Sequence, residues 1–226
     1  VVQDDHASEA VAVRAFRAQG DSSLQFRFKL YHRGGAVPLS DVLPILADMG
    51  LKTLEEFGHA VHPVGDTPIH LHEFLLEDPR GGDLVFADIK DAFESAFGAV
   101  WMGRTDSDGF NRLVVELGVD WRTAALVRTL ARYRAQTGLD PSQAVQEEAL
   151  RDHPDVARAI VSLFACKFDP DHGGDTKARA GDASASDKIL ALLQDVKSLD
   201  HDRVLRRMAL LVGAIKRTNF YQTRAD

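Results

Sequence analysis

An alternating segment near the start of the chain constrains the fold more than any other feature of the sequence. In residues 24–31 one set of side chains is apolar and the intervening set is mostly polar: Leu24, Phe26, Phe28 and Leu30 against Gln25, Arg27, Lys29 and Tyr31. Because successive side chains of a strand point to opposite faces, this alternation predicts a strand with one face in a core. Such a strand needs a second layer to cover its apolar face.

A helix over residues 39–49 is expected to supply that layer. Its start falls at Leu39 or Ser40, and Gly50 supplies a left-handed C-terminal stop. Pro44 is expected near the first turn, where a missing N–H costs least. The apolar side chains that would lie on the sheet are Val42, Leu43, Ile45 and Leu46. The strand, a short glycine-containing connection and this helix together indicate a ferredoxin-like α+β layer.

Three further segments extend the expected sheet, one before this strand and two after the helix. Residues 9–17 alternate weakly and precede a turn, which favours a strand paired with residues 24–32; a short helix is the alternative. Residues 51–61 and 69–77 flank the turn-rich segment His62–Pro68 and predict a hairpin. The sheet is therefore expected to have three or four strands.

The rest of the chain is expected to be mainly helical. Residues 83–102 carry apolar side chains at spacings of three and four, which predicts an amphipathic helix that closes an α+β domain over residues 1–103. Residues 104–226 predict an all-α domain. Its expected helices, bounded by capping residues or glycines, are 109–117, 121–137, one that starts at Asp140-Pro-Ser-Gln143, 155–168, 187–198 and 201 to about 221. Residues 169–186 are rich in Gly, Asp, Ala and Ser and are expected to form a mobile loop.

The last expected helix has an apolar stripe and a basic edge. The basic residues are Arg203, Arg206, Arg207, Lys216 and Arg217. We expect Arg206, Arg207 and Arg217 to make interdomain contacts with acidic groups of a neighbouring domain or subunit. The alternative is a solvated basic edge, because exposed ion pairs contribute under ~1 kcal/mol.

Charge and cysteine content narrow the class of protein. A net charge of -7 argues against a general nucleic-acid surface, since phosphate binding requires a local excess of Lys and Arg. The single cysteine, Cys166, cannot form an intramolecular disulfide and is expected to be a buried thiol in a reducing compartment. No apolar run approaches the roughly 20 residues that span a bilayer. We therefore expect a cytoplasmic protein without nucleic-acid or membrane partners.

No motif in the sequence indicates a catalytic or metal centre. The connection Arg33-Gly34-Gly35 follows a strand and precedes a helix, but it is too short for a phosphate-binding fingerprint. A cluster of His59, His62, His70 and His72 on the expected hairpin is geometrically conceivable, but exposed strand histidines are common. Residues 169–180 begin like a calcium loop and lack the acidic residue at position twelve. We assign no metal.

Several blocks spread along the chain have an unusual composition. The main ones are Phe26-Arg-Phe-Lys-Leu-Tyr31, Leu39-Ser-Asp-Val-Leu-Pro-Ile-Leu46, Ser107-Asp-Gly-Phe-Asn-Arg-Leu113, Asp120-Trp-Arg122, Leu199-Asp200 and Arg217-Thr-Asn-Phe-Tyr-Gln222. These blocks resemble the very large bacterial NAD-dependent glutamate dehydrogenases, which carry long N-terminal regulatory extensions. The strand, connection and helix at residues 24–50 also resemble the start of ACT domains, which sense small molecules. The resemblance therefore implies an ACT-like domain followed by a helical domain.

The resemblance also implies a function. The family oxidatively deaminates L-glutamate to 2-oxoglutarate and ammonia with NAD as the cofactor, and its catalytic groups lie beyond the block that ends at Gln222. We therefore expect a regulatory and assembly segment that contacts other domains or subunits of a homo-oligomer, with no catalytic, cofactor-binding or metal-binding residue of its own. In ACT domains the corresponding connection often lines an amino-acid effector site, which makes the loop of Arg33, Gly34 and Gly35 a candidate effector loop; a plain turn is the favoured alternative. A self-contained interaction module without enzymatic context is the competing hypothesis for the whole chain.

Overall fold

The computed structural model describes residues 11–64, 67–81, 85–138, 142–172 and 175–222. It divides into two compact units, one up to residue 125 and one from residue 126 onward. The first unit contains a sheet with helices, and the second contains helices alone. The boundary expected from the sequence, at residue 103, differs from this division after residue 125.

Among the described residues, four strands form one antiparallel sheet in the order β1-β2-β4-β3. The strands are β1 (Ala12–Phe16), β2 (Gln25–Arg33), β3 (Lys52–Val61) and β4 (Ile69–Glu77). The register aligns Phe28 with Phe74, so the apolar sets of β2 and β4 share one face. This arrangement confirms the expected α+β class and the predicted strand in residues 9–17.

The order of elements along the chain differs from the usual ferredoxin-like order. That unit runs β-α-β-β-α-β, whereas the first unit of this chain runs β-β-α-β-β-α. Here β1 pairs antiparallel with the edge of β2, the place that the final strand of a ferredoxin-like unit takes. The sheet is therefore ferredoxin-like in its layers, with its edge strand supplied from the start of the chain.

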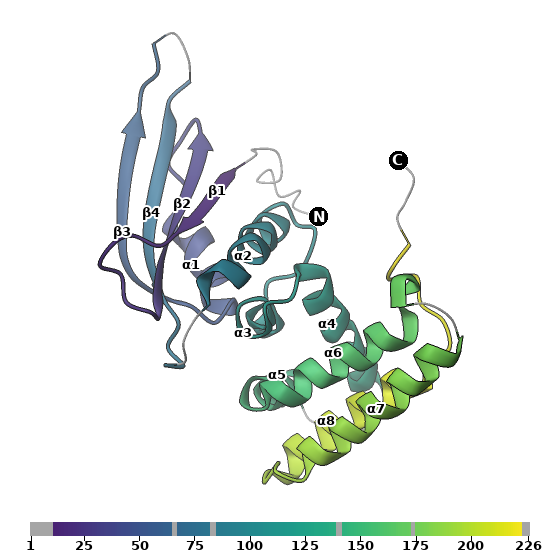
Figure 1. The fold of residues 1–226 in the computed structure, drawn as a ribbon. Helices are drawn as coiled ribbons and strands as arrows, with labels where there is room; N and C mark the ends of the chain where they lie inside the picture. Colours follow the sequence, from purple (N-terminus) through teal and green to yellow (C-terminus); the bar gives the residue numbers. More distant parts are fainter. Residues whose placement is uncertain (1–10, 65–66, 82–84, 139–141, 173–174, 223–226) are drawn as a thin grey trace. The chain divides into compact units, whose positions relative to one another are not determined.

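Two helices cover the apolar face of the sheet, α1 (Leu39–Asp48) and α2 (Phe86–Trp101) (Figure 1). α1 packs near β3 and α2 near β1. Their shared core is built on aromatic rings: the centroid of Phe28 lies 4.7 Å from that of Phe97 and 5.2 Å from that of Phe93, and Phe26 contacts Phe93 at 5.2 Å. All four side chains are fully buried.

One prediction for α1 is confirmed and another is wrong. Gly50 adopts the expected left-handed conformation, with φ at 80°. Pro44 lies in the interior of the helix, so its expected position near the first turn is wrong. The missing N–H removes the helical bond to Ser40, and the exposure of Ser40 lets water take that place.

A short helical segment completes the first unit. It consists of a 3₁₀ turn, η2 (Gly109–Arg112), and a single α-helical turn, α3 (Leu113–Leu117). Asp108 accepts a hydrogen bond from the Phe110 N–H at 3.1 Å, which confirms the predicted cap. Asp120 caps the next helix, α4 (Trp121–Gln136), by accepting a bond from the Thr123 N–H at 2.7 Å.

The second unit contains the part of α4 from residue 126 onward and the helices that follow it. They are α5 (Gln143–Asp152), α6 (Pro154–Phe168), a 3₁₀ turn η3 (Pro170–His172), α7 (Asp175–Leu193) and α8 (Leu199–Ala214). α6 packs against both α7 and α8, and α5 packs against α8. The expected cap at Asp140 lies outside the described residues.

Several expectations for this unit are wrong. The predicted loop over residues 169–186 is helical from Asp175 onward, because α7 extends to Leu193. The segment contains Ala178, Ala180, Ala183 and Ala185, and alanine favours helix more strongly than any other residue. The last helix ends at Ala214 and not near Tyr221. Cys166 is half-buried, not buried.

Candidate functional site

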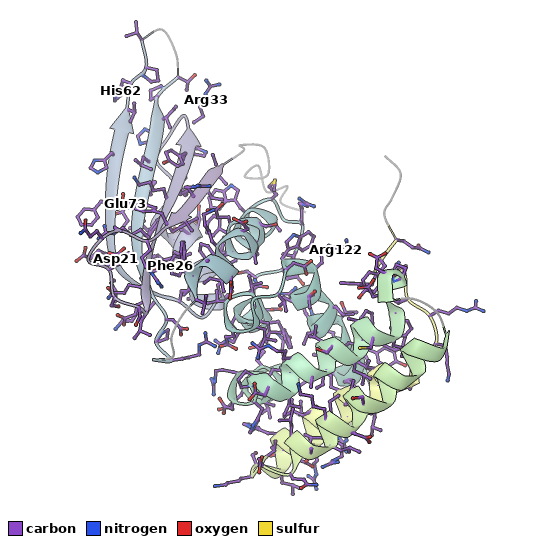
Figure 2. The ribbon with its side chains drawn as sticks, in the orientation of Figure 1. Asp21, Phe26, Arg33, His62, Glu73 and Arg122 are labelled. Atoms are coloured by element: carbon purple, nitrogen blue, oxygen red, sulfur yellow. The ribbon has the colours of Figure 1, made fainter. Side chains whose placement is uncertain are left out.

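The loop expected to bind an effector is fixed by backbone contacts at one end of the sheet. Arg33 is the last residue of β2, and the Gly34 N–H donates to the Pro68 carbonyl at 2.9 Å. The Gly35 carbonyl oxygen lies 2.7 Å from Nδ1 of His32. Gly34 adopts a φ of 103°, a conformation that residues with a Cβ rarely take. Figure 2 shows Arg33 and His62 at this end of the sheet, with Asp21 toward the other.

Imidazole groups line the helix-covered face of the sheet near this loop. His32 on β2 lies opposite His70 on β4, and His72 is two residues further along β4 on the same face. His72 is 8% exposed, and its Nδ1 lies 2.8 Å from a carboxylate oxygen of Glu56 on β3. Its Nε2 is buried and has no hydrogen-bond partner among the described residues. The sequence predicted the histidines but gave no sign of Glu56 as their neighbour.

The strand register separates the histidines that were considered as a metal cluster. His59 lies opposite Leu71, so its side chain points to the uncovered face, whereas His70 and His72 lie on the covered face. Within the described part of the chain, no group of three or more His, Cys, Asp or Glu side chains could hold a metal ion.

The uncovered face of the sheet carries a network of ion pairs that the sequence did not predict. Arg27 contacts Asp21 at 3.1 Å and Glu73 at 3.0 Å, and Lys29 contacts Glu73 at 3.2 Å. Burial opposes the ionisation of Asp21, but the Ala18 N–H and Arg27 lower its pKa below the ordinary value. Burial likewise opposes ionisation of Glu73, and Arg27 with Lys29 lowers its pKa. The network fastens β2 to β4 on the side without helices.

The three arginines expected to make interdomain contacts lie in or just after α8. Arg206 pairs with Asp202 one turn earlier on the same helix, at 2.7 Å. Arg207 is half-buried, and Arg217 is exposed beyond the end of the helix. Arg206 also borders an apolar groove between α6, α7 and α8 whose lining includes Leu163, Ile189, Leu193 and Leu210. These arginines belong to the second unit, and the loop of Arg33 belongs to the first.

A pair of histidines joins the start of α8 to the corner between α5 and α6. Nδ1 of His201 lies 3.4 Å from Nε2 of His153, with the rings edge to face. Burial lowers the pKa of His153, the positive charge of His201 lowers it further, and Asp152 opposes the shift. No local pattern in the sequence indicates this contact, because His153 and His201 are 48 residues apart in the chain.

The comparisons with known proteins follow the same order of modules. Residues 10–89 match the model for "Glutamate dehydrogenase, ACT3 domain", and residues 105–170 match that for "Glutamate dehydrogenase, helical motif 3". Residues 188–226 match that for "Bacterial NAD-glutamate dehydrogenase, catalytic domain". The antiparallel sheet under two helices thus defines an ACT-type domain joined to a helical motif, which confirms the expected fold.

Curated relatives agree over most of the chain. Proteins named NAD-specific glutamate dehydrogenase match with 35% identity over 94% of the chain in Halomonas elongata, 36% over 91% in Pseudomonas aeruginosa and 35% over 84% in Mycobacterium tuberculosis. The chain spans 13%, 13% and 12% of the lengths of these relatives. It belongs to the bacterial NAD-dependent glutamate dehydrogenase family, as the resemblance predicted.

The matches assign the candidate residues to different modules of the family. The loop of Arg33, Gly34 and Gly35 falls in the ACT3 match, and Arg206, Arg207 and Arg217 fall in the catalytic-domain match. The described helices include none with the length and apolar character that a membrane span requires.

The histidine pair predicts a dependence of stability on pH. Since folding depresses the pKa of His153, the unfolded chain binds the proton first as the pH falls below about 6.5. The melting temperature of the full chain should therefore fall between pH 7.5 and pH 5.5. His153→Asn should flatten this dependence, because Asn does not titrate and is a good residue for the N-cap position of α6.

The charged neighbours Arg151, Asp152 and Asp202 remain in place in this variant. His59→Asn, at an exposed position of β3, is the matched control and should keep the wild-type pH dependence. Equal slopes of melting temperature against pH in His153→Asn and the wild type would contradict the role of the pair.

Proposed function

We propose that this chain is a regulatory and assembly segment of an NAD-dependent glutamate dehydrogenase in the cytoplasm. The complete protein oxidises L-glutamate to 2-oxoglutarate and ammonia and transfers a hydride to NAD. The observation that carries the proposal is the succession of an ACT domain, a helical motif and the start of a catalytic-domain match in one chain. The catalytic groups and the NAD site belong to other parts of the complete protein, which assembles as a homo-oligomer.

The regulatory role centres on the loop between β2 and α1. Pro38 precedes α1 without a side-chain cap, so the N–H groups of Leu39 and Ser40 can donate to a carboxylate at the positive end of the helix. Arg33 ends β2, at the start of the loop that leads to α1. The hydrogen bond from the Gly34 N–H to the Pro68 carbonyl fixes the backbone of this loop. These features suit a small amino acid, whose carboxylate would bind the helix start.

Titration of the full chain with L-amino acids tests the effector loop. At least one of them should raise the melting temperature, since a ligand that binds only the folded state stabilises it. Gly34→Val should abolish this rise. Gly20→Val is the matched control, because Gly20 has the same φ of 103° in a turn outside the loop. Both variants carry comparable strain, so a rise that persists in Gly34→Val or is lost equally in both would contradict the proposal.

The assembly role centres on the basic edge of α8. Arg206 has a partner in Asp202, but its guanidinium remains partly exposed and can accept a second carboxylate. Arg207 follows it, and Arg217 lies in the segment after the helix. We propose that these three arginines bind acidic groups of a neighbouring domain or subunit and so hold the catalytic part in place.

Activity of the complete protein tests both parts of this proposal. The wild type should form NADH from L-glutamate and NAD. Arg206→Ala with Arg207→Ala should lower the activity or alter the oligomeric state, because the contact to the catalytic part is lost, while the melting temperature of the 226-residue chain changes little.

Arg158→Ala is the control for a lost surface charge, since Arg158 is exposed on α6 and pairs only weakly with Asp155 at 3.5 Å. A wild-type protein without glutamate-dependent NADH formation would remove the proposed function. Unchanged activity and assembly in the double variant would contradict the assembly role and show that the arginines form only a solvated edge.

A further inference from the structure

Lys167, in the last turn of α6, bonds to the end of α8. Its ammonium donates to the carbonyl oxygen of Val212 at 3.2 Å and to that of Gly213. The last four carbonyls of a helix have no partner within the helix. A cation near them is also favoured by the negative end of the helix dipole. Lys167 therefore satisfies two backbone acceptors that α8 leaves open.

This contact lies where α8 ends. Ile215 has φ -59° and ψ 131°, so the backbone leaves the helix in an extended direction directly after Ala214. A longer helix would use the Val212 and Gly213 carbonyls for its own N–H groups. At this end of α8 the same carbonyls accept from Lys167.

The same end of α6 also holds the segment that follows α8. Phe164, one turn before Lys167, is 2% exposed. The ring of Phe220 packs edge to face on it with centroids 5.5 Å apart, and the ring of Tyr221 stacks at 6.3 Å. Phe168 contacts Phe164 from the other side, at 4.9 Å. Residues of the last two turns of α6 thus fix both the end of α8 and the chain that leaves it.

These contacts join two modules of the family. Phe164 and Lys167 fall in the match to helical motif 3, whereas α8 and residues 215–222 fall in the match to the catalytic domain. All of them lie in the second compact unit. A displacement of the end of α8 would therefore change the direction in which the catalytic part continues from the helical motif.

We propose that Lys167 is a positioning residue for the dehydrogenase reaction. Its two bonds to the end of α8, supported by the packing of Phe164 on Phe220 and Tyr221, set the path of residues 215–222 and align the catalytic part with the helical motif. This inference rests on the proposed function. Lys167 acts through the backbone carbonyls of Val212 and Gly213.

Variants at Lys167 in the complete protein test the inference. Lys167→Met keeps the apolar stem and removes the ammonium. It should lower kcat about tenfold or more, because a small misalignment of the catalytic part displaces the reacting groups. The KM values for L-glutamate and NAD should stay within about twofold of the wild type, since no binding group is removed. Lys167→Arg should restore most of kcat, as a guanidinium can reach both carbonyls.

A second measurement separates positioning from stability. Hydrogen exchange of residues 215–222 should speed up in Lys167→Met and in the milder Lys167→Gln, and it should stay near wild type in Lys167→Arg. A residue that only stabilises the fold would lower the melting temperature and leave kcat per folded protein unchanged. Lys197→Met, an exposed lysine between α7 and α8, is the control for a lost charge and should change neither readout.

The outcomes distinguish this inference from the function beneath it. A wild-type protein without glutamate-dependent activity would overturn the proposed function and this inference with it. An active wild type with normal kcat and normal exchange in both Lys167→Met and Lys167→Gln would overturn the role of Lys167 alone. If Lys167→Met does not fold, Lys167→Gln supplies the same comparison.

Discussion

Burial of the apolar stripe of α8 against α5 and α6 is the interaction on which the second unit depends. The stripe consists of Val204, Leu205, Met208 and Val212, each at most 2% exposed. Burial of side chains of this size contributes about 1.5 to 3 kcal/mol each. The ends of α8 are fixed separately, by His153 at its start and Lys167 at its end. Because α8 lies in the catalytic-domain match and α6 in the helical-motif match, the two modules share one hydrophobic core.

The two faces of the sheet in the first unit have different roles. The phenylalanine rings of β2, β4 and α2 form the covered face, and the pairs of Arg27 and Lys29 with Asp21 and Glu73 occupy the uncovered face. A strand that is apolar on one side and charged on the other can contribute to the core and to the ion pairs at once. This arrangement leaves the loop of Arg33 at the end of the sheet, where neither the core nor the ion pairs cover it.

The sequence predicted the elements whose signals are local. The alternation of residues 24–31 gave β2 and its buried face, and Gly50, Gly118 and Gly138 marked helix ends where φ is positive. The hairpin of β3 and β4 followed from two alternating runs around a turn. Each of these signals depends on residues within a few positions of one another.

Features that depend on distant partners could not be predicted in this way. Lys167 is the last polar residue of α6, and its carbonyl partners lie 45 and 46 residues later, at the end of α8. His153 and His201 meet only because α5, α6 and α8 pack together. Tyr133 lies on α4 and is 56% exposed, since helical spacing places a residue on a face without saying what covers that face.

Hydrogen exchange of the complete protein under mild denaturant tests most directly whether α6 and α8 share one core. The account predicts that the slowest amides of α6 and α8 exchange with the same free energy of opening and the same dependence on denaturant. The reason is that neither helix can unfold without exposing the apolar side chains of the other. Exchange of α8 through a separate opening of lower free energy, while α6 stays protected, would contradict it.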